Sequence, residues 1–300
     1  MALATNETLL VTGASGKFGH RVVEHLLTTY AVPASQIIAT TRKPESLADF
    51  AAKGVRVRAA DFDDEASLAK AFAGATRLLI VSTDALDRPG RRLEQHLRAV
   101  SAAKSAGIKH VVYTSMPDPK VDSPIPFAGD HRGTEEAIAA SGIAHAILRN
   151  SWYMENLLMS LPGALASGQW VVASGQGKTS HTAREDQARA AAAVLASGSV
   201  NSATYTLTGP EALSAEETAK IVSEVVGKPL QVVHVSPDQL KEGMIAHGVP
   251  DFLAPLFVSF DVNALEGNID MVTDAINALS GTAPQTLRQW VGANKAAFGG

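Results

Sequence analysis

The chain has 300 residues, of which 46% are hydrophobic and 19% are charged, a composition typical of a packed globular protein. Its formal net charge of −4 provides no field that would attract nucleic acid or an acidic membrane, and the absence of cysteine excludes disulfides, thiolate metal sites and a cysteine nucleophile. No apolar run approaches the roughly 18 residues that a membrane helix needs, and the first residues show no targeting pattern. We therefore expect a cytoplasmic monomer or homodimer with no nucleic-acid and no membrane partner.

Short β-branched apolar runs alternate with longer amphipathic segments in the first half of the chain. Strands are expected at 8–14, 36–41, 55–60, 76–82, 109–115 and 144–150. Helices long enough for right-handed crossover connections are expected between them, at 18–30, 64–73, 91–106 and 130–141. This alternation predicts an α/β fold with a doubly wound parallel sheet over residues 1–150.

The regular alternation loosens after residue 150. A helical segment near 152–167 and a short strand at WVVA come first, and a second helix and strand at approximately 184–208 are expected to return to the sheet. Residues 151–300 are therefore predicted to form a smaller C-terminal region that is interleaved with the first domain.

Three glycines follow the first predicted strand in the segment LLVTGASGKFGHRVVEHLL. They permit a tight turn and a close backbone approach, and the N-terminus of the next helix presents amides and a positive dipole to a pyrophosphate. The motif predicts a dinucleotide site of the Rossmann type, whereas the alternative is a strand–turn–helix that uses small residues for packing alone. The expected cofactor-binding residues of this loop are Gly13, Ala14, Ser15, Gly16, Lys17, Phe18 and Gly19.

The second predicted strand ends in ATTRKPE, where no carboxylate is available for the ribose hydroxyls of NAD. Arg42 can instead form a fork-shaped, charge-assisted contact with a 2′-phosphate, and Lys43 adds positive potential beside it. We therefore expect NADP(H) to be preferred, with NAD(H) as the second cofactor. The alternative is that both cations only solvate the start of the next helix.

The tips of the third and fourth predicted strands supply further candidate cofactor contacts. Asp61 and Phe62 follow the third strand, where they can meet the adenine, although Asp61 is equally placed to cap the helix that begins near Asp64. Ser82 and Thr83 follow the fourth strand. They are expected beside the dinucleotide, because ligands of open α/β sheets bind outside the carboxyl ends of the strands.

Four segments carry a more specific signal, namely VTGASGKFGHRVVEHLL, PASQIIATTRKPE, GIKHVVYTS and SGIAHAILRNSWYMENL. Together they resemble the NmrA-like atypical short-chain dehydrogenases/reductases, and the resemblance covers nearly the whole chain. Within that group the bacterial NADPH:quinone oxidoreductases are the most similar, and the triphenylmethane dye reductases come second. The resemblance implies a substrate-binding C-terminal region and a reductase that transfers hydride from NADPH to a small, quinone-like conjugated acceptor.

The resemblance also locates the catalytic region. Ser115 stands where short-chain dehydrogenases keep a serine near the substrate oxygen, and it is also a candidate cofactor contact. Their Tyr-x-x-x-Lys pair is missing, because His131 takes the position of the tyrosine and Glu135 that of the lysine. A glutamate does not lower the pKa of a neighbouring phenol as an ammonium does. The reduction of an ordinary ketone therefore lacks the side chain that would donate a proton to the alkoxide. A quinone spreads the incoming charge over its ring, and orienting NADPH against such a ring supplies catalysis through proximity.

The candidate catalytic residues are therefore His131, Ser115, Asn150 and Tyr153. His131 is expected either to donate a proton to the reduced quinone or to hydrogen-bond the cofactor or substrate. The alternative is a helix histidine that packs against Glu135. Asn150 and Tyr153 follow the sixth strand and, by resemblance, reach the nicotinamide. A flat acceptor can stack on aromatic side chains. The expected substrate contacts are Met116, Phe127, Trp152 and Tyr153.

Two other functions fit the same sequence. NmrA-like proteins include regulators that bind NAD(P) and act through protein partners, and a missing acid pair is equally compatible with lost chemistry. A non-enzymatic redox sensor is therefore the main alternative. The other is a reductase of a different conjugated acceptor, such as a triarylmethane dye or an enone.

The remaining polar residues have structural explanations. His181 and the other histidines outside the predicted site show no pairing with carboxylates at a familiar metal-site spacing, so we expect no metal. Arg184 and Asp186 precede an alanine-rich helix, which they are expected to cap and to match in dipole. Gly175 and Gly177 in SGQGK lack the spacing of a phosphate loop and are expected to form a turn.

Overall fold

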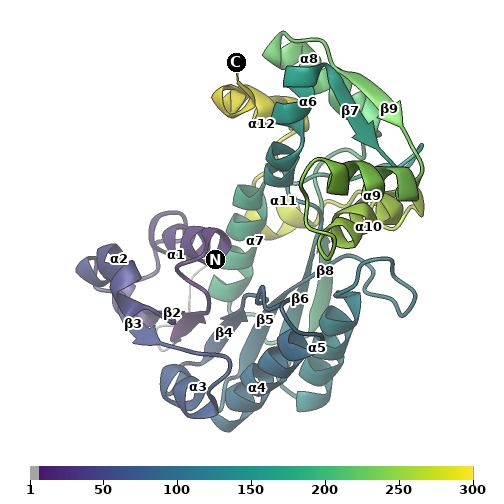
Figure 1. Cartoon of the computed structure of the whole chain (residues 1–300). Coiled ribbons are helices and arrows are strands. Elements are labelled where there is room, and N and C mark those ends of the chain that lie inside the picture. The colour runs from purple at the N-terminus through teal and green to yellow at the C-terminus, as the bar shows by residue number, and fades with distance from the viewer. Residues whose placement is uncertain (1–6, 300) are drawn as a thin grey trace.

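The computed structural model describes residues 7–299, and a seven-stranded parallel sheet lies at its centre (Figure 1). The strand order is β3-β2-β1-β4-β5-β6-β8, so the direction of winding reverses between β1 and β4 and the sheet is doubly wound. Its strands are β1 (Leu9–Val11), β2 (Ile37–Thr41), β3 (Arg56–Ala59), β4 (Arg77–Ile80), β5 (His110–Ser115), β6 (Ala144–Asn150) and β8 (Ala203–Leu207).

Helices cover both faces of this sheet because both faces of each central strand are apolar. Successive residues of β1 point to opposite sides, and Leu9 and Val11 enter one hydrophobic core while Leu10 enters the other. The first core is covered by α1 (Lys17–Thr28), α7 (Arg184–Ala196) and α11 (Ala275–Ser280). The second is covered by α3 (Glu65–Phe72), α4 (Arg91–Ser105) and α5 (Ala128–Ser141). The α/β Rossmann-type prediction is confirmed, and each strand and helix expected before residue 150 is present.

A second layer of elements follows β6 and lies above the sheet in Figure 1. β7 (Gln169–Val172) and β9 (Gln231–His234) pair in parallel as a separate small sheet. Two helices precede β7, namely η3 (Met154–Met159) and α6 (Leu161–Ser167), and α8 (Ala215–Val226) lies between β7 and β9 in the chain. After β9 come α9 (Pro237–Ala246), α10 (Ala254–Leu265) and α12 (Leu287–Ala293). The remaining short helices are η1 (Ala34–Gln36), η2 (Pro44–Leu47), α2 (Ala48–Ala52) and η4 (Lys295–Phe298).

The chain returns to the large sheet between these elements. α7 packs on α1, and β8 pairs in parallel with β6, with Ala203 opposite Ala146. The second layer has a core of its own, which includes Met154, Val222 and Trp290. The two layers are thus joined by several chain crossings, while the division near residue 150 stays a prediction. None of the helices within residues 7–299 is long and apolar enough to cross a membrane.

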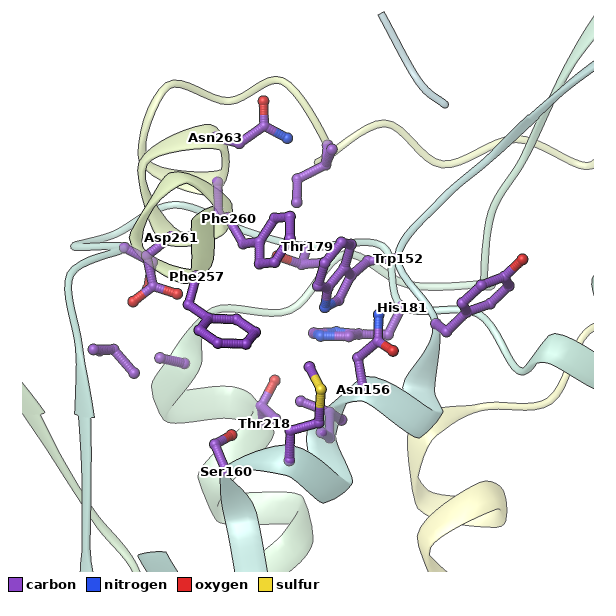
Figure 2. Close-up of a pocket in the computed structure, with 18 of the residues that line it drawn as sticks. Trp152, Asn156, Ser160, Thr179, His181, Thr218, Phe257, Phe260, Asp261 and Asn263 are labelled. Atoms are coloured by element: carbon purple, nitrogen blue, oxygen red, sulfur yellow. The ribbon is translucent and has the colours of Figure 1, made fainter. Parts of the chain in front are cut away.

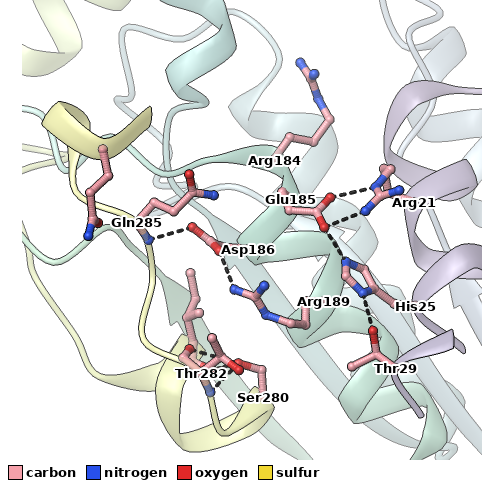
Figure 3. A network of polar contacts seen from close by, with 12 residues as sticks. Arg21, His25, Thr29, Arg184, Glu185, Asp186, Arg189, Ser280, Thr282 and Gln285 are labelled. Carbon is pink, nitrogen blue, oxygen red and sulfur yellow. Dashed lines mark hydrogen bonds and ion pairs between the residues drawn. The ribbon is translucent and has the colours of Figure 1, made fainter. Parts of the chain in front are cut away.

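An ion-pair network fastens α7 to α1 (Figure 3). Arg21 donates two hydrogen bonds of 2.6 Å to the carboxylate of Glu185, and Nε2 of His25 lies 3.0 Å from the same group. Nδ1 of His25 contacts the hydroxyl of Thr29 at 2.9 Å. His25 first and Arg21 second lower the pKa of Glu185 to about 2, against the opposing effect of burial. The charge of Glu185 therefore stabilises the packing of these two helices.

The start of α7 differs in part from its prediction. The N-cap residue is Ala183, whose side chain cannot cap, so the expectation that Arg184 or Asp186 caps the helix is wrong. Asp186 does lie in the first turn, where its charge matches the dipole. Its fully buried carboxylate also accepts the backbone N–H of Gln285 at 2.8 Å and pairs with Arg189. Asp186 thereby connects α7 to the C-terminal segment, as Figure 3 shows.

Candidate cofactor and acceptor site

The glycine loop between β1 and α1 has the geometry that a phosphate-binding turn requires. Gly13 has φ +60°, and its carbonyl accepts the N–H of Gly16 at 2.9 Å. A Cβ on Gly19 would lie 2.4 Å from the carbonyl oxygen of Gly13, so only glycine lets α1 approach the loop this closely. Within residues 7–299 no side chain caps the start of α1, whose first turn holds no acidic residue. Its free N–H groups and dipole therefore face outward beside Ser15 and Lys17, which are exposed.

Arg42 lies next to this loop at the end of β2. The hydroxyl groups of Ser15 and Thr41 are 2.8 Å apart, and this contact joins the loop to the tip of the strand. Arg42 and Lys43 are exposed, and the guanidinium of Arg42 has no ion pair or hydrogen bond with any residue that the structure describes. An unpaired cation beside a turn with free amides suits a phosphate group.

The residues after β3 and β4 occupy different environments. Asp64, and not Asp61, caps α3, because its side chain accepts the N–H groups of the next turn. Asp61 instead accepts the N–H of Asp63 at 2.9 Å. Phe62 is only 9% exposed and packs in the hydrophobic core, so it offers little surface to a ligand. A contact of Asp61 and Phe62 with the adenine stays a prediction.

The tips of β4 and β5 are joined by hydrogen bonds. The N–H of Ser82 donates to the hydroxyl of Thr114 at 2.8 Å, and the N–H of Thr83 donates to Nε2 of His96 at 3.0 Å. His96 is buried, and burial lowers its pKa to about 3, so it is a neutral acceptor. These bonds fix the backbone of Ser82 and Thr83 at the edge where the dinucleotide is expected.

Ser115 at the end of β5 is hydrogen-bonded to the carboxylate of Glu135, which accepts the hydrogen bond and donates none. Its hydroxyl donates to Oε1 of Glu135 at 2.5 Å, and Arg149 on the neighbouring strand donates to Oε2 at 2.7 Å. The register of β5 and β6 places Ser115 opposite Arg149, which explains how one carboxylate reaches both. The usual tyrosine position therefore holds the buried His131, and the usual lysine position holds Glu135, which is paired with Arg149.

His131 uses both ring nitrogens within the protein. Nδ1 lies 2.9 Å from the hydroxyl of Tyr113, and Nε2 lies 2.9 Å from Arg92. An arginine only donates, so Nε2 is the acceptor and Nδ1 carries the proton. Burial, followed by the charge of Arg92, lowers the pKa of His131 well below its usual range. His131 is thus a neutral residue in the wall of the cavity described next. It does not pair with Glu135, which binds Ser115 and Arg149 instead.

A cavity of about 900 Å³ lies between the tips of β4–β6 and the second layer. The predicted substrate contacts Met116, Phe127, Trp152 and Tyr153 all line it. Phe257 and Phe260 on α10 line it as well, and the ring centroids of Trp152 and Phe260 are 4.2 Å apart. Figure 2 shows Trp152, Phe257 and Phe260 around the central space. The wall is suited to a flat conjugated ring.

Tyr153 packs between the sheet and the second layer. The guanidinium carbon of Arg184 lies 4.7 Å from the centroid of its ring, and burial raises the pKa of Tyr153 to about 12. Arg184 also lines the cavity, beside Glu155. The ring of Tyr153 is therefore held as a neutral phenol at the edge of the predicted site.

Several polar atoms in the cavity wall lack hydrogen-bond partners among the described residues. They are Oδ1 and Nδ2 of Asn150, Nδ1 of His181 and Oγ1 of Thr218. His181 reaches the wall because the chain after β7 returns to Trp152, whose carbonyl accepts the N–H of Thr182 at 2.9 Å. No local pattern in the sequence signals this contact. In the described part of the chain, no cluster of three or more His, Cys, Asp or Glu side chains is arranged to hold a metal ion.

Comparisons with known proteins agree with this geometry. The sequence model of the NmrA-like family matches residues 5–290. Quinone oxidoreductase 2 of Escherichia coli is 37% identical over 283 residues, which cover 94% of this chain and 97% of that protein. The structure of E. coli NADPH-dependent quinone oxidoreductase complexed with NADPH has a TM-score of 0.89 at 36% identity, and the match covers 95% of this chain and 99% of that one. Citrobacter sp. triphenylmethane reductase complexed with NADP(H) has a TM-score of 0.86 at 34% identity, with 94% and 98% covered. The chain belongs to the NmrA-like family.

Proposed function

We propose that this chain is an NADPH-dependent reductase that transfers hydride to a quinone-like conjugated acceptor. The observation that carries the proposal is the aromatic cavity at the tips of β4–β6, which meets the predicted dinucleotide site at Ser82, Ser115 and Asn150. A flat acceptor in this cavity would lie against the position expected for the nicotinamide.

The residues around the glycine loop fit NADP(H). The guanidinium of Arg42 has no partner among the described residues and is available to bind a 2′-phosphate. The first amides of α1 suit the pyrophosphate. The E. coli quinone oxidoreductase is described as complexed with NADPH and the Citrobacter reductase with NADP(H), and both cover nearly all of this chain. The cofactor would supply the hydride, and the protein would supply its position.

Two polar residues are proposed to orient the nicotinamide. Neither amide atom of Asn150 makes a well-formed hydrogen bond among residues 7–299, although the amide lies near the hydroxyl of Tyr153 and acts to lower the pKa of that phenol. An amide donor and acceptor side by side complement a carboxamide. The hydroxyl of Ser115 donates its hydrogen bond to Glu135, so its oxygen is left as an acceptor for an N–H group. On this proposal Ser115 positions a ligand and does not donate to the substrate oxygen.

The acceptor is proposed to be quinone-like because the site favours stacking over acid catalysis. His131 is neutral and bound to Arg92 and Tyr113, and Glu135 is paired with Arg149. A ketone would need a donor for its developing alkoxide, whereas a conjugated ring delocalises the incoming charge. A proton-donating role for His131 stays a prediction and would require this network to rearrange.

Anaerobic stopped-flow absorbance of NADPH oxidation tests the proposal. The acceptors are benzoquinones, naphthoquinones, triarylmethane dyes, enones and simple ketones. Rapid oxidation with quinones and none with ketones is expected. Preference for dyes or enones would contradict the acceptor but keep the reductase. Tight binding of NADPH with no reduction of any acceptor would instead support the regulator that senses NAD(P).

A further inference from the structure

His181 and Thr218 in the wall of the acceptor cavity each have one polar atom that no described residue satisfies, while the ring of His181 also contacts the backbone of Thr179. His181 is 8% exposed and Thr218 is 1% exposed, and Nδ1 of the first and Oγ1 of the second have no hydrogen-bond partner within the described chain. They come from different elements, a loop after β7 and helix α8. Figure 2 shows both directed toward the space that Trp152 and Phe257 also border.

Two other polar side chains in the same wall, Asp261 and His131, are already satisfied. The carboxylate of Asp261 accepts the N–H of Ala173 at 2.6 Å, and His131 uses both ring nitrogens. A buried polar atom without a partner costs about 1–3 kcal/mol, so native proteins retain few of them without a reason. The contrast with Asp261 and His131 indicates that His181 and Thr218 are kept for a ligand.

The chemistry of the two groups limits what that ligand presents. Burial lowers the pKa of His181 to about 4, so its ring is neutral at pH 7 and offers one donor and one acceptor. The hydroxyl of Thr218 offers both as well. Two neutral groups suit a carbonyl or hydroxyl oxygen. They find no partner on a triarylmethane dye whose dialkylamino groups carry no N–H.

We propose that His181 and Thr218 are specificity-determining residues that bind an oxygen of the acceptor, so that the cavity selects oxygen-bearing quinones over triarylmethane dyes. The inference rests on the proposed reductase function and adds the group on the substrate that the site recognises. It requires no proton transfer, because the hydrogen bonds only hold the ring. An acceptor without the oxygen leaves two buried polar groups unpaired, and such sites discriminate strongly.

The test compares 1,4-naphthoquinone with crystal violet in the full-length protein. His181→Leu and Thr218→Val remove the polar atoms at similar volume, Thr218→Ser restores a hydroxyl, and Ser160→Ala is the control. Ser160 lines the same cavity but is exposed, so water satisfies its hydroxyl. Each variant is measured for kcat/KM with the quinone, for kcat/KM or inhibition by the dye, and for NADPH affinity and thermal unfolding.

His181→Leu and Thr218→Val are each expected to lower kcat/KM for the quinone about tenfold or more. The values for the dye and the affinity for NADPH should change less than about threefold, and Thr218→Ser should retain most of the quinone activity.

An equal loss for quinone and dye would overturn the proposal, because it would indicate a role in cavity shape. So would a quinone loss no greater than that of Ser160→Ala. If the wild-type protein reduced neither compound, the proposed function itself would fail, which is a separate result. Thr218→Val keeps the test decisive if His181→Leu does not fold.

Discussion

The hydroxyl of Ser115 donates to Glu135 at 2.5 Å, and the same carboxylate binds Arg149. In short-chain dehydrogenases these positions would hold a serine near the substrate oxygen and a lysine that lowers the pKa of the catalytic tyrosine. Here the serine proton is committed to a carboxylate, and the nearby cation is neutralised. The arrangement joins β5, β6 and α5 through one carboxylate and leaves neither Ser115 nor Glu135 as a proton donor.

Glu135→Gln is expected to affect stability more than chemistry. The amide keeps the shape but removes the charge that pairs with Arg149, which is partly exposed, so we expect a loss of about 1 kcal/mol in the free energy of unfolding. The single-turnover rate of hydride transfer to a quinone should change less than about threefold. Urea denaturation and stopped-flow absorbance measure the two quantities. A rate at least tenfold lower with unchanged stability would place Glu135 in the chemistry instead.

The pH dependence of hydride transfer reports on His131. Burial and the charge of Arg92 hold its pKa well below the ordinary value of 6.5, so the ring stays neutral as pH falls through that value. A quinone reduction rate that is flat between about pH 6 and 8 is therefore expected in single-turnover measurements. A rate that falls as pH rises through 6.5, and loses this dependence in His131→Gln, would show that a protonated His131 takes part.

The network around Glu185 predicts a pH-dependent stability. Its pKa is lowered from 4.5 to about 2 in the folded protein, so its contribution is fully present above 4.5 and is lost as pH falls toward 2. The side chain is one-third exposed, and solvent screening reduces the effect to about 1–2 kcal/mol. Glu185→Gln should therefore lower the free energy of unfolding by this amount at pH 7, and by less at pH 3.

Denaturation at both pH values checks this expectation. Glu224→Gln is a matched control, because Glu224 pairs with Arg288 on the surface, where solvent screening makes the loss clearly smaller than in Glu185→Gln. A loss in Glu185→Gln that is as small as in the control, or that is the same at pH 3 and pH 7, would contradict the assignment.

The fold could be predicted from the sequence because its signals are local. Apolar β-branched runs mark the strands, and the glycine pattern marks the turn before α1. The turn at Gly175 and Gly177 was also predicted correctly, since Gly175 has φ +53° and Gly177 donates to the carbonyl of Ser174. What the sequence could not show is why Gly177 must be small. A Cβ there would lie 2.2 Å from the carbonyl oxygen of Ala264 on α10.

The acceptor site depends on such long-range contacts and could be predicted only in part. Trp152 follows from its place at the tip of β6, and Phe127 from the loop that follows β5. Phe257, Phe260 and His181 do not, because α10 and the loop after β7 reach the cavity only through the packing of the second layer. His181 has no metal-site spacing, so its place in the sequence indicates no role. The property that distinguishes it, a buried nitrogen without a partner, exists only in the folded chain.

The side chain of Arg42 provides the sharpest test of the cofactor assignment. It has no ion pair or hydrogen bond among residues 7–299 and lies at the tip of β2, beside the contact between Ser15 and Thr41. A charge-assisted contact with a 2′-phosphate is worth about 1.5–3 kcal/mol, so Arg42→Ala should weaken the binding of NADPH about 10–100-fold. NADH has no such phosphate, and its dissociation constant should change less than about threefold. Fluorescence titration measures both constants.

Lys43→Ala is the control and should have a smaller effect, because an ammonium lacks the fork geometry of arginine. Equal losses for NADPH and NADH would show that Arg42 only shapes the loop, and the 2′-phosphate site would have to be sought elsewhere on the dinucleotide edge of the sheet.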